Sequence, residues 1–164
     1  TPPVPDMKKI INPYLHLQGY NCFGCAPHNP LGVHMEFYED GDDIVSHWTP
    51  GHNHQGWLHT LHGGIQATLL DELCGWVVMR KCQTAGVTMR MTTQYKRPVS
   101  TLGGTITLRA RLVQMRRNIA TIAAELLDAD GRLCTTSECT YFCFPPDKAQ
   151  HDFHFSTRHV EGEE

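Results

Sequence analysis

The sequence predicts an α+β protein in which an antiparallel β-sheet wraps around one long central helix. Residues 61–80 are apolar on nearly every side of a helix, so this helix must be covered all round. Four later segments alternate with a period of two and are rich in β-branched or aromatic residues, which is typical of strands that could cover it. Their connectors are short, which favours antiparallel pairing.

The individual strands follow from the same patterns. Residues 33–39 and 43–49 alternate apolar and polar side chains on either side of Gly41-Asp42, which predicts a hairpin before the helix. After the helix, strands are expected over residues 85–98, 103–115, 118–131 and 132–144. Because the connectors between them are short, we expect these four strands to be sequence neighbours in a meander.

Length and composition indicate one globular domain. The chain has 164 residues, of which 40% are hydrophobic and 19% charged. We expect a lead-in over residues 1–21, the domain over 22–145 and a tail over 146–164. The net charge of −3 offers no overall attraction to a nucleic acid, which we therefore do not expect as a partner.

The sequence also carries signals of cellular location. No apolar run approaches the roughly 20 residues that cross a bilayer, and the start "TPPVPDMKK" lacks a secretory apolar region. The seven cysteines are an odd number spread along the chain, which favours reduced thiols over a disulfide framework. We therefore expect a soluble, cytoplasmic protein without a membrane span.

The start of the helix has the residues of an anion site. Backbone amides at a helix N-terminus are unpaired, and Gly63-Gly64 would let a carbonyl oxygen approach them as it gains negative charge. The alternative is that these glycines only permit close packing of the helix start. His62 could orient a substrate or simply form a hydrogen bond within the loop.

Asp71 is the most informative charged residue. A carboxylate on an apolar helix costs several kcal/mol to bury unless it is paired or lines a wet cleft. The alternative is a solvated helix face, which would suit Glu72 equally well. Leu69, Leu70 and Leu73 leave little room for such a face, so we expect Asp71 to have a polar partner or a cleft.

Three stretches carry a resemblance to a known family: "QGWLHTLHGGIQATLLDELCGWVV" (55–78), "TMRMTTQYKRPV" (88–99) and, more weakly, "CFGCAPHNPLGVHMEF" (22–37). The chain resembles the acyl-coenzyme A thioesterases of the hot-dog superfamily, in the branch related to phenylacetic-acid-pathway and 4-hydroxybenzoyl-coenzyme A thioesterases. The resemblance implies a hot-dog fold and hydrolysis of an acyl-coenzyme A to a free acid and coenzyme A, without a cofactor.

The same resemblance implies roles for particular residues. Asp71 falls where these enzymes have their catalytic Asp, acting as general base or nucleophile. Thr88 falls where they often have a Ser or Thr that holds water or the carboxylate. Some relatives have an Asn before His-Gly-Gly, where this chain has no secure match, and Gln55 is our choice for a polar contact to substrate or water.

The spacing of Gly63 and Asp71 predicts that two subunits share the site. Eight residues separate them, which is about 12 Å along a helix, so one thioester carbon cannot touch both. The helices of two subunits would then run antiparallel across a twofold axis. The resemblance also implies dimers or dimers of dimers, so a homodimer or a homotetramer is expected.

Residues that could bind coenzyme A or the acyl group are less distinctive. Arg97, Arg116 and Arg117, with Lys96, lie at expected strand ends, where they could meet phosphates or simply be solvated. Arg97 matches the strand ending of the resembling family best. Trp57 could line an acyl pocket or contact a partner subunit.

We expect no metal site. Cys22-x-x-Cys25 with His28 and His34 has zinc-like spacing, but a second Cys pair is missing and the segment resembles the lead-in of the family. Two other functions stay open: a hot-dog dehydratase acting on hydroxyacyl thioesters, and a non-catalytic module that binds acyl thioesters.

Overall fold

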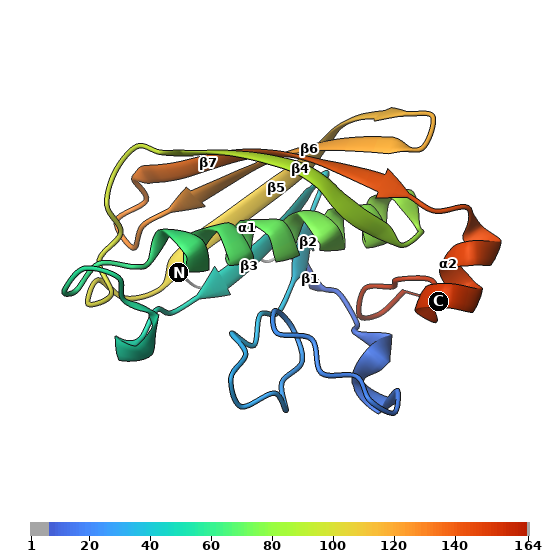
Figure 1. Cartoon of the computed structure of the whole chain (residues 1–164), viewed down its shortest axis with the longest axis horizontal. Helices are drawn as coiled ribbons and strands as arrows, with labels where there is room; N and C mark the ends of the chain where they lie inside the picture. The colour runs from blue at the N-terminus through green and yellow to red at the C-terminus, as the bar shows by residue number, and fades with distance from the viewer. Residues whose placement is uncertain (1–6, 164) are drawn as a thin grey trace.

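The computed structural model describes residues 7–163. Within these residues, seven antiparallel strands form one curved sheet, and helix α1 lies in its concave face (Figure 1). The strands are β1 (Lys8–Lys9), β2 (Tyr38–Asp40), β3 (Asp43–Trp48), β4 (Gly86–Tyr95), β5 (Ile106–Arg116), β6 (Ile119–Leu127) and β7 (Leu133–Cys143). The α+β class and the hot-dog arrangement expected from the sequence are confirmed.

Helix α1 (Gly63–Val77) is buried along most of its length because apolar side chains occur on all sides. Leu69, Leu70, Leu73 and Val77 are fully buried, and the helix packs against β3, β4, β5, β6 and β7. It continues as a π-helical turn (Val78–Cys82) and ends at Gln83 in the left-handed conformation. The helix expected over residues 61–80 therefore begins two residues later and changes its hydrogen bonding at its C-terminal end.

The strand order is β1-β2-β3-β5-β6-β7-β4. The meander of β5, β6 and β7 agrees with the prediction, but the expected position of β4 beside β5 is wrong. Strand β3 pairs with β5 from Asp43↔Arg111 to Trp48↔Ile106, and this leaves the edge of β7 for β4. The loop after β4 thus crosses to the far side of the sheet instead of forming a hairpin.

The expected strand over residues 33–39 is reduced to β2, which has three residues. Val33, Met35 and Phe37 do alternate into the core, as the sequence pattern indicated. The backbone of this segment bonds to a loop instead of a strand, because the Val33 and Met35 amides donate to the carbonyl oxygens of Phe23 (2.9 Å) and Gly24 (2.8 Å).

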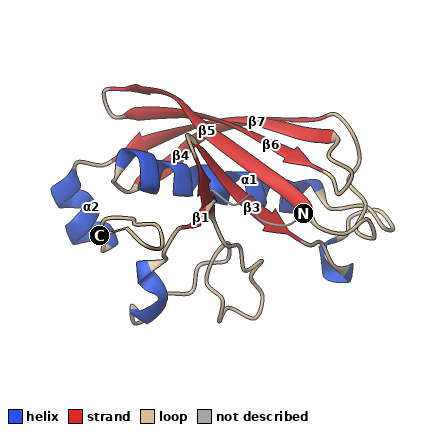
Figure 2. Cartoon of the chain, turned by 180° about the vertical axis from the view of Figure 1, so that it is seen from behind, coloured by secondary structure: helices blue, strands red, loops and turns tan. Residues whose placement is uncertain are grey.

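Both ends of the described chain pack on the side of α1 that faces away from the sheet (Figures 1 and 2). The lead-in includes a 3-10 helix (Pro13–His16), and the tail includes α2 (Pro146–Phe153). Phe144 and Phe153 stack with ring centroids 4.6 Å apart, and Ile10 pairs with Val160. A 3-10 helix (His52–His54) precedes the turn into α1. None of the helices in residues 7–163 combines the length and the apolar character that crossing a membrane requires.

Candidate active site

Asp71 is held by side chains from two different strands. Its Oδ1 accepts hydrogen bonds from the Thr88 hydroxyl of β4 at 2.8 Å and from the Tyr141 hydroxyl of β7 at 2.6 Å. The Tyr141 hydroxyl is also 2.8 Å from the carbonyl oxygen of Asp71. Both side-chain contacts fall on Oδ1, so within residues 7–163 Oδ2 has no donor. The polar partner expected for Asp71 is therefore present.

Tyr141 was not among the residues predicted from the sequence. Its signal was weak, because a tyrosine in a strand of period two is ordinary and its inward direction becomes clear only in the register of β7. Burial, with the nearby Cys74 and Asp71, raises the pKa of Tyr141. The phenol therefore stays protonated and donates to the carboxylate.

A pocket of about 390 Å³ opens beside Asp71. Thr88, Tyr141 and Glu72 line it together with Asp71, and most of the remaining wall is apolar or aromatic. The apolar and aromatic part consists of Tyr14, Leu17, Tyr20, Trp76, Met79, Ala85 and Phe153. Because lead-in, helix and tail all contribute, the packing of both chain ends shapes this cavity. Its size and lining suit an acyl chain next to a carboxylate.

At the N-terminal end of α1, His62 caps the helix. Its Nδ1 accepts a hydrogen bond of 2.9 Å from the Gly64 amide, and the Tyr95 hydroxyl donates to the Gly63 carbonyl oxygen at 2.8 Å. A Cβ on residue 64 would lie 2.9 Å from the His62 ring, so Gly64 is explained by the cap. The Gly63 amide, like that of Ile65, has no acceptor within residues 7–163, so this helix end retains free donors.

A groove of about 800 Å³ runs past this helix end. Trp57, Lys96 and Arg97 line it together with His62 and Gly63. Trp57 is 87% exposed and contributes nothing to the core of this chain. Arg97 and Trp57, which the sequence suggested as substrate contacts, thus lie in the same groove as the Gly63 amide.

The remaining predicted contacts lie elsewhere. The Gln55 side chain accepts a hydrogen bond from the His59 amide at 3.1 Å, which holds the loop before the helix. Arg116 and Arg117 are exposed in the hairpin between β5 and β6. The register through Ile119, Phe142 and Val87 places this hairpin at the Thr88 end of the sheet, far from Arg97.

The pocket with Asp71 and the groove with the Gly63 amide therefore lie at different places along α1, the first near its middle and the second at its N-terminal end. Eight residues of helix, about 12 Å, separate Gly63 from Asp71. The two groups cannot act on the same carbon atom within one chain.

Comparison with known proteins identifies relatives of this chain. The sequence model of the family described as thioesterase superfamily matches residues 58–135. A Thermoplasma acidophilum protein, named as a presumed esterase, is 29% identical over 85 residues, which are 51% of this chain and 63% of that protein.

Solved structures share the fold. A crystal structure titled as a thioesterase superfamily protein has 27% identity and a TM-score of 0.66, covering 71% of this chain and 57% of that one. A Streptococcus pneumoniae thioesterase solved with coenzyme A has 20% identity and a TM-score of 0.63, covering 68% and 90%. A Streptococcus mutans protein bound to acetyl coenzyme A has 17% identity and a TM-score of 0.65, covering 80% and 98%.

The chain spans less than two thirds of the Thermoplasma relative and of the first of these structures, 63% and 57% of their lengths. The matched segment nevertheless contains α1, the His62-Gly63-Gly64 turn, Asp71 and Thr88. Residues 58–135 are thus similar in sequence to the thioesterase superfamily, and the sheet wrapped around α1 is a hot-dog fold that the solved structures share.

Proposed function

We propose that this protein is a thioesterase that hydrolyses an acyl-coenzyme A to a free acid and coenzyme A. The observation that carries the proposal is Asp71, a carboxylate on an apolar helix that lines a pocket and is held by Thr88 and Tyr141 through one of its two oxygens. The superfamily match supports the reaction class. The relatives solved with coenzyme A or acetyl coenzyme A support the substrate class.

Asp71 would act through Oδ2. As a general base it would take a proton from water while the water oxygen bonds to the thioester carbon, the C–S bond breaks and the thiolate of coenzyme A receives a proton. As a nucleophile it would bond to the thioester carbon while the C–S bond breaks and coenzyme A leaves as a thiolate that is then protonated, and water would open the resulting acyl anhydride to the free acid and the carboxylate of Asp71. In both cases Thr88 and Tyr141 keep the carboxylate oriented. The Streptococcus pneumoniae thioesterase has also been solved with an aspartate or a threonine replaced by alanine.

The oxyanion donor would be the Gly63 amide of a second copy of the chain. Strand β4 is the edge of the sheet, and its exposed side chains include Val87, Met89 and Tyr95. A long edge strand with exposed apolar residues is a surface for pairing with another chain. Antiparallel pairing of two β4 edges about a twofold axis would bring the Thr88 end of one sheet to the Tyr95 end of the other.

This arrangement would complete the site. It would set the pocket with Asp71 against the groove with Gly63 of the other copy, and Arg116 and Arg117 against its Arg97. The guanidinium groups of these arginines from both copies would then surround the entrance of the combined site, where the phosphates of coenzyme A would bind. The proposed assembly is a homodimer, alone or paired into a tetramer, and the proposed branch is the phenylacetic-acid-pathway type.

The test is a hydrolysis screen over short, long and aromatic acyl-coenzyme A substrates, with a thiol reagent to detect released coenzyme A. We expect turnover with at least one class, and its loss in Asp71→Asn with the oligomer intact. A dehydratase would change the acyl chain without releasing thiol, and a binding module would retain the thioester. Either result, or full activity of Asp71→Asn, would refute the proposal.

A further inference from the structure

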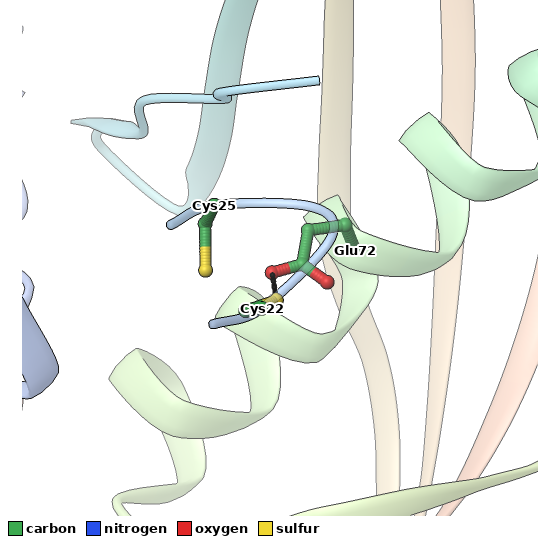
Figure 3. Close-up of side chains that lie close together, drawn as sticks. All are labelled: Cys22, Cys25 and Glu72. Carbon is green, nitrogen blue, oxygen red and sulfur yellow. Dashed lines mark hydrogen bonds between the residues drawn. The ribbon is translucent and has the colours of Figure 1, made fainter. Parts of the chain in front are cut away.

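Two cysteines of the lead-in loop meet a carboxylate of the central helix. The side chains of Cys22, Cys25 and Glu72 point toward one another (Figure 3), and one ligand atom from each lies within 4.8 Å of the other two. The Cys22 thiol donates to Oε1 of Glu72 at 3.4 Å. In a tetrahedral zinc site, a sulfur and an oxygen ligand are about 3.6 Å apart and two sulfurs about 3.8 Å. The three side chains thus already lie near the spacing that zinc imposes.

Gly24 allows the lead-in loop to approach Glu72 closely. Gly24, between the two cysteines, is buried against Glu72, and a Cβ there would lie 2.4 Å from its carboxyl carbon. Glycine at this position therefore lets the loop place both cysteines against the carboxylate.

Glu72 is oriented by its neighbours. The indole N–H of Trp76 donates to Oε1 of Glu72 at 3.3 Å, and Trp76 is itself fixed by stacking on Phe37 with centroids 4.7 Å apart. A partner that fixes a ligating side chain is a regular feature of metal sites. The carboxylate thus faces the two thiols in a defined direction.

The charges around the cluster also suit a divalent cation. Two thiolates and a carboxylate would place three negative charges in a largely buried position, which is unfavourable without a cation. Arg158 is 0% exposed and stacks on Tyr14 and Trp76. Within residues 7–163 its guanidinium has no carboxylate partner. Burial lowers the pKa of Arg158, whereas negative charge on Cys25 would raise it. A divalent cation would offset two of the three negative charges, and Arg158 the third.

We propose that Cys22, Cys25 and Glu72 bind a zinc ion that fastens the lead-in loop to helix α1. The fourth position belongs to the Tyr20 hydroxyl, which is 2.9 Å from the Cys25 sulfur, or to a water molecule from the adjoining pocket. Since Tyr20 and Glu72 also line the pocket beside Asp71, the ion would stabilise one wall of it.

This ligand set differs from the one considered from the sequence, which combined the two cysteines with His28 and His34. The ring Nε2 atoms of His28 and His34 bond to the backbone carbonyl oxygens of Tyr20 and Asn29, so neither histidine joins the cluster. Glu72 replaces them as the third ligand. The sequence-based expectation of no metal rested on the missing second Cys pair and on the resemblance of this segment to the lead-in of the family, whereas the structure adds a carboxylate from α1 to the two cysteines.

The test is the metal content of the untagged protein, prepared from zinc-supplemented cells and passed over a chelating resin. We expect about one zinc ion per chain in the wild type, seen by elemental analysis and by native mass spectrometry. Cys22→Ser and Glu72→Gln should lower zinc affinity about tenfold or more. Cys82→Ser is the matched control, because Cys82 is a half-buried thiol beside Cys143, away from the cluster, and should keep its zinc.

Cobalt substitution gives a second readout. Thiolate-to-cobalt absorption should appear in the wild type and in Cys82→Ser, and should weaken strongly in Cys22→Ser. Circular dichroism of Glu72→Gln, which keeps the size of the side chain, checks that loss of metal does not merely reflect unfolding.

Three results would overturn the proposal. They are a metal-free wild type with both thiols reduced, a wild type lighter by two hydrogen atoms with a mapped Cys22–Cys25 disulfide, and zinc retained in both cluster variants. The last result would place the ion on other residues, such as the histidines near residue 52. Because the readout is metal content, its outcome is independent of the proposed hydrolysis.

Discussion

The hydroxyl groups of Tyr141 and Thr88 both bind the same carboxylate oxygen of Asp71, at 2.6 and 2.8 Å, from strands on one side of the central helix. This arrangement orients the carboxylate, which lines the pocket, and leaves Oδ2 without a donor among the described residues. Hydrogen bonds to a charged group are worth about 1.5–3 kcal/mol each, so their removal has a measurable effect.

Tyr141→Phe should lower kcat about tenfold or more and leave KM nearly unchanged, because the hydroxyl contacts Asp71 and not the substrate. Tyr38→Phe, a change of the same kind in β2, is the control and should have full activity. Steady-state kinetics on the best substrate from the screen measures both. Wild-type kcat in Tyr141→Phe would show that the contact does not support catalysis.

Two substitutions of Thr88 separate the contribution of its hydroxyl group from that of the rest of the side chain. Thr88→Ser keeps the donor to Oδ1 and should retain most of the activity, whereas Thr88→Ala should lose about tenfold in kcat/KM. The residue is exposed at the edge of β4, so both variants should fold. Equal activity of the two variants would contradict this role.

The two glycines at the helix start should respond differently to alanine. In Gly64→Ala, the new Cβ would lie 2.9 Å from the His62 ring and displace the cap, which should lower the free energy of unfolding by about 1 kcal/mol. In Gly63→Ala the nearest atom is a Tyr95 ring carbon at 3.5 Å, an ordinary contact, so stability should change little. Denaturant unfolding of both variants tests this, and the reverse order of stabilities would rule it out.

Docking of the C-terminal tail should depend on pH through Arg80. Its guanidinium lowers the pKa of Glu163 to about 2 and, with Lys81, also lowers the pKa of Glu39. A carboxylate whose pKa is depressed in the folded state adds stability that is present above its unfolded pKa of about 4.3 and is lost as pH falls through the folded pKa. Thermal unfolding between about pH 2 and pH 7 should therefore show a smaller acid-induced loss in Glu163→Gln than in the wild type. Parallel curves for the two proteins would exclude this contribution.

The sequence predicted the parts of the structure that depend on local pattern. The all-round apolar character of residues 61–80 required a covered helix, and a charged Asp71 within it required a polar partner. Thr88 provides that partner, although its role in the reaction stays a prediction. The pairing of β4 with β7 could not be predicted from loop length, because it depends on β3 having already taken the edge of β5.

Long-range contacts explain what the sequence did not indicate. Tyr141 reaches Asp71 only through the register of β7 against β4, and Glu72 reaches Cys22 only because the lead-in folds back onto α1. In both cases the residue type is ordinary for its position in the sequence, and its role becomes visible only from a contact with a residue far away in the chain.

Complementation between two inactive variants tests the shared site most directly. Asp71→Asn lacks the carboxylate, and Gly63→Val blocks the approach to the helix amide. Each alone should be inactive. A heterodimer would combine the intact Asp71 of one copy with the intact Gly63 of the other, in one of its two sites. Equal amounts of the two chains, unfolded and refolded together, should therefore recover about a quarter of wild-type activity. No recovery, with heterodimers verified by native mass spectrometry, would contradict a site built from two subunits.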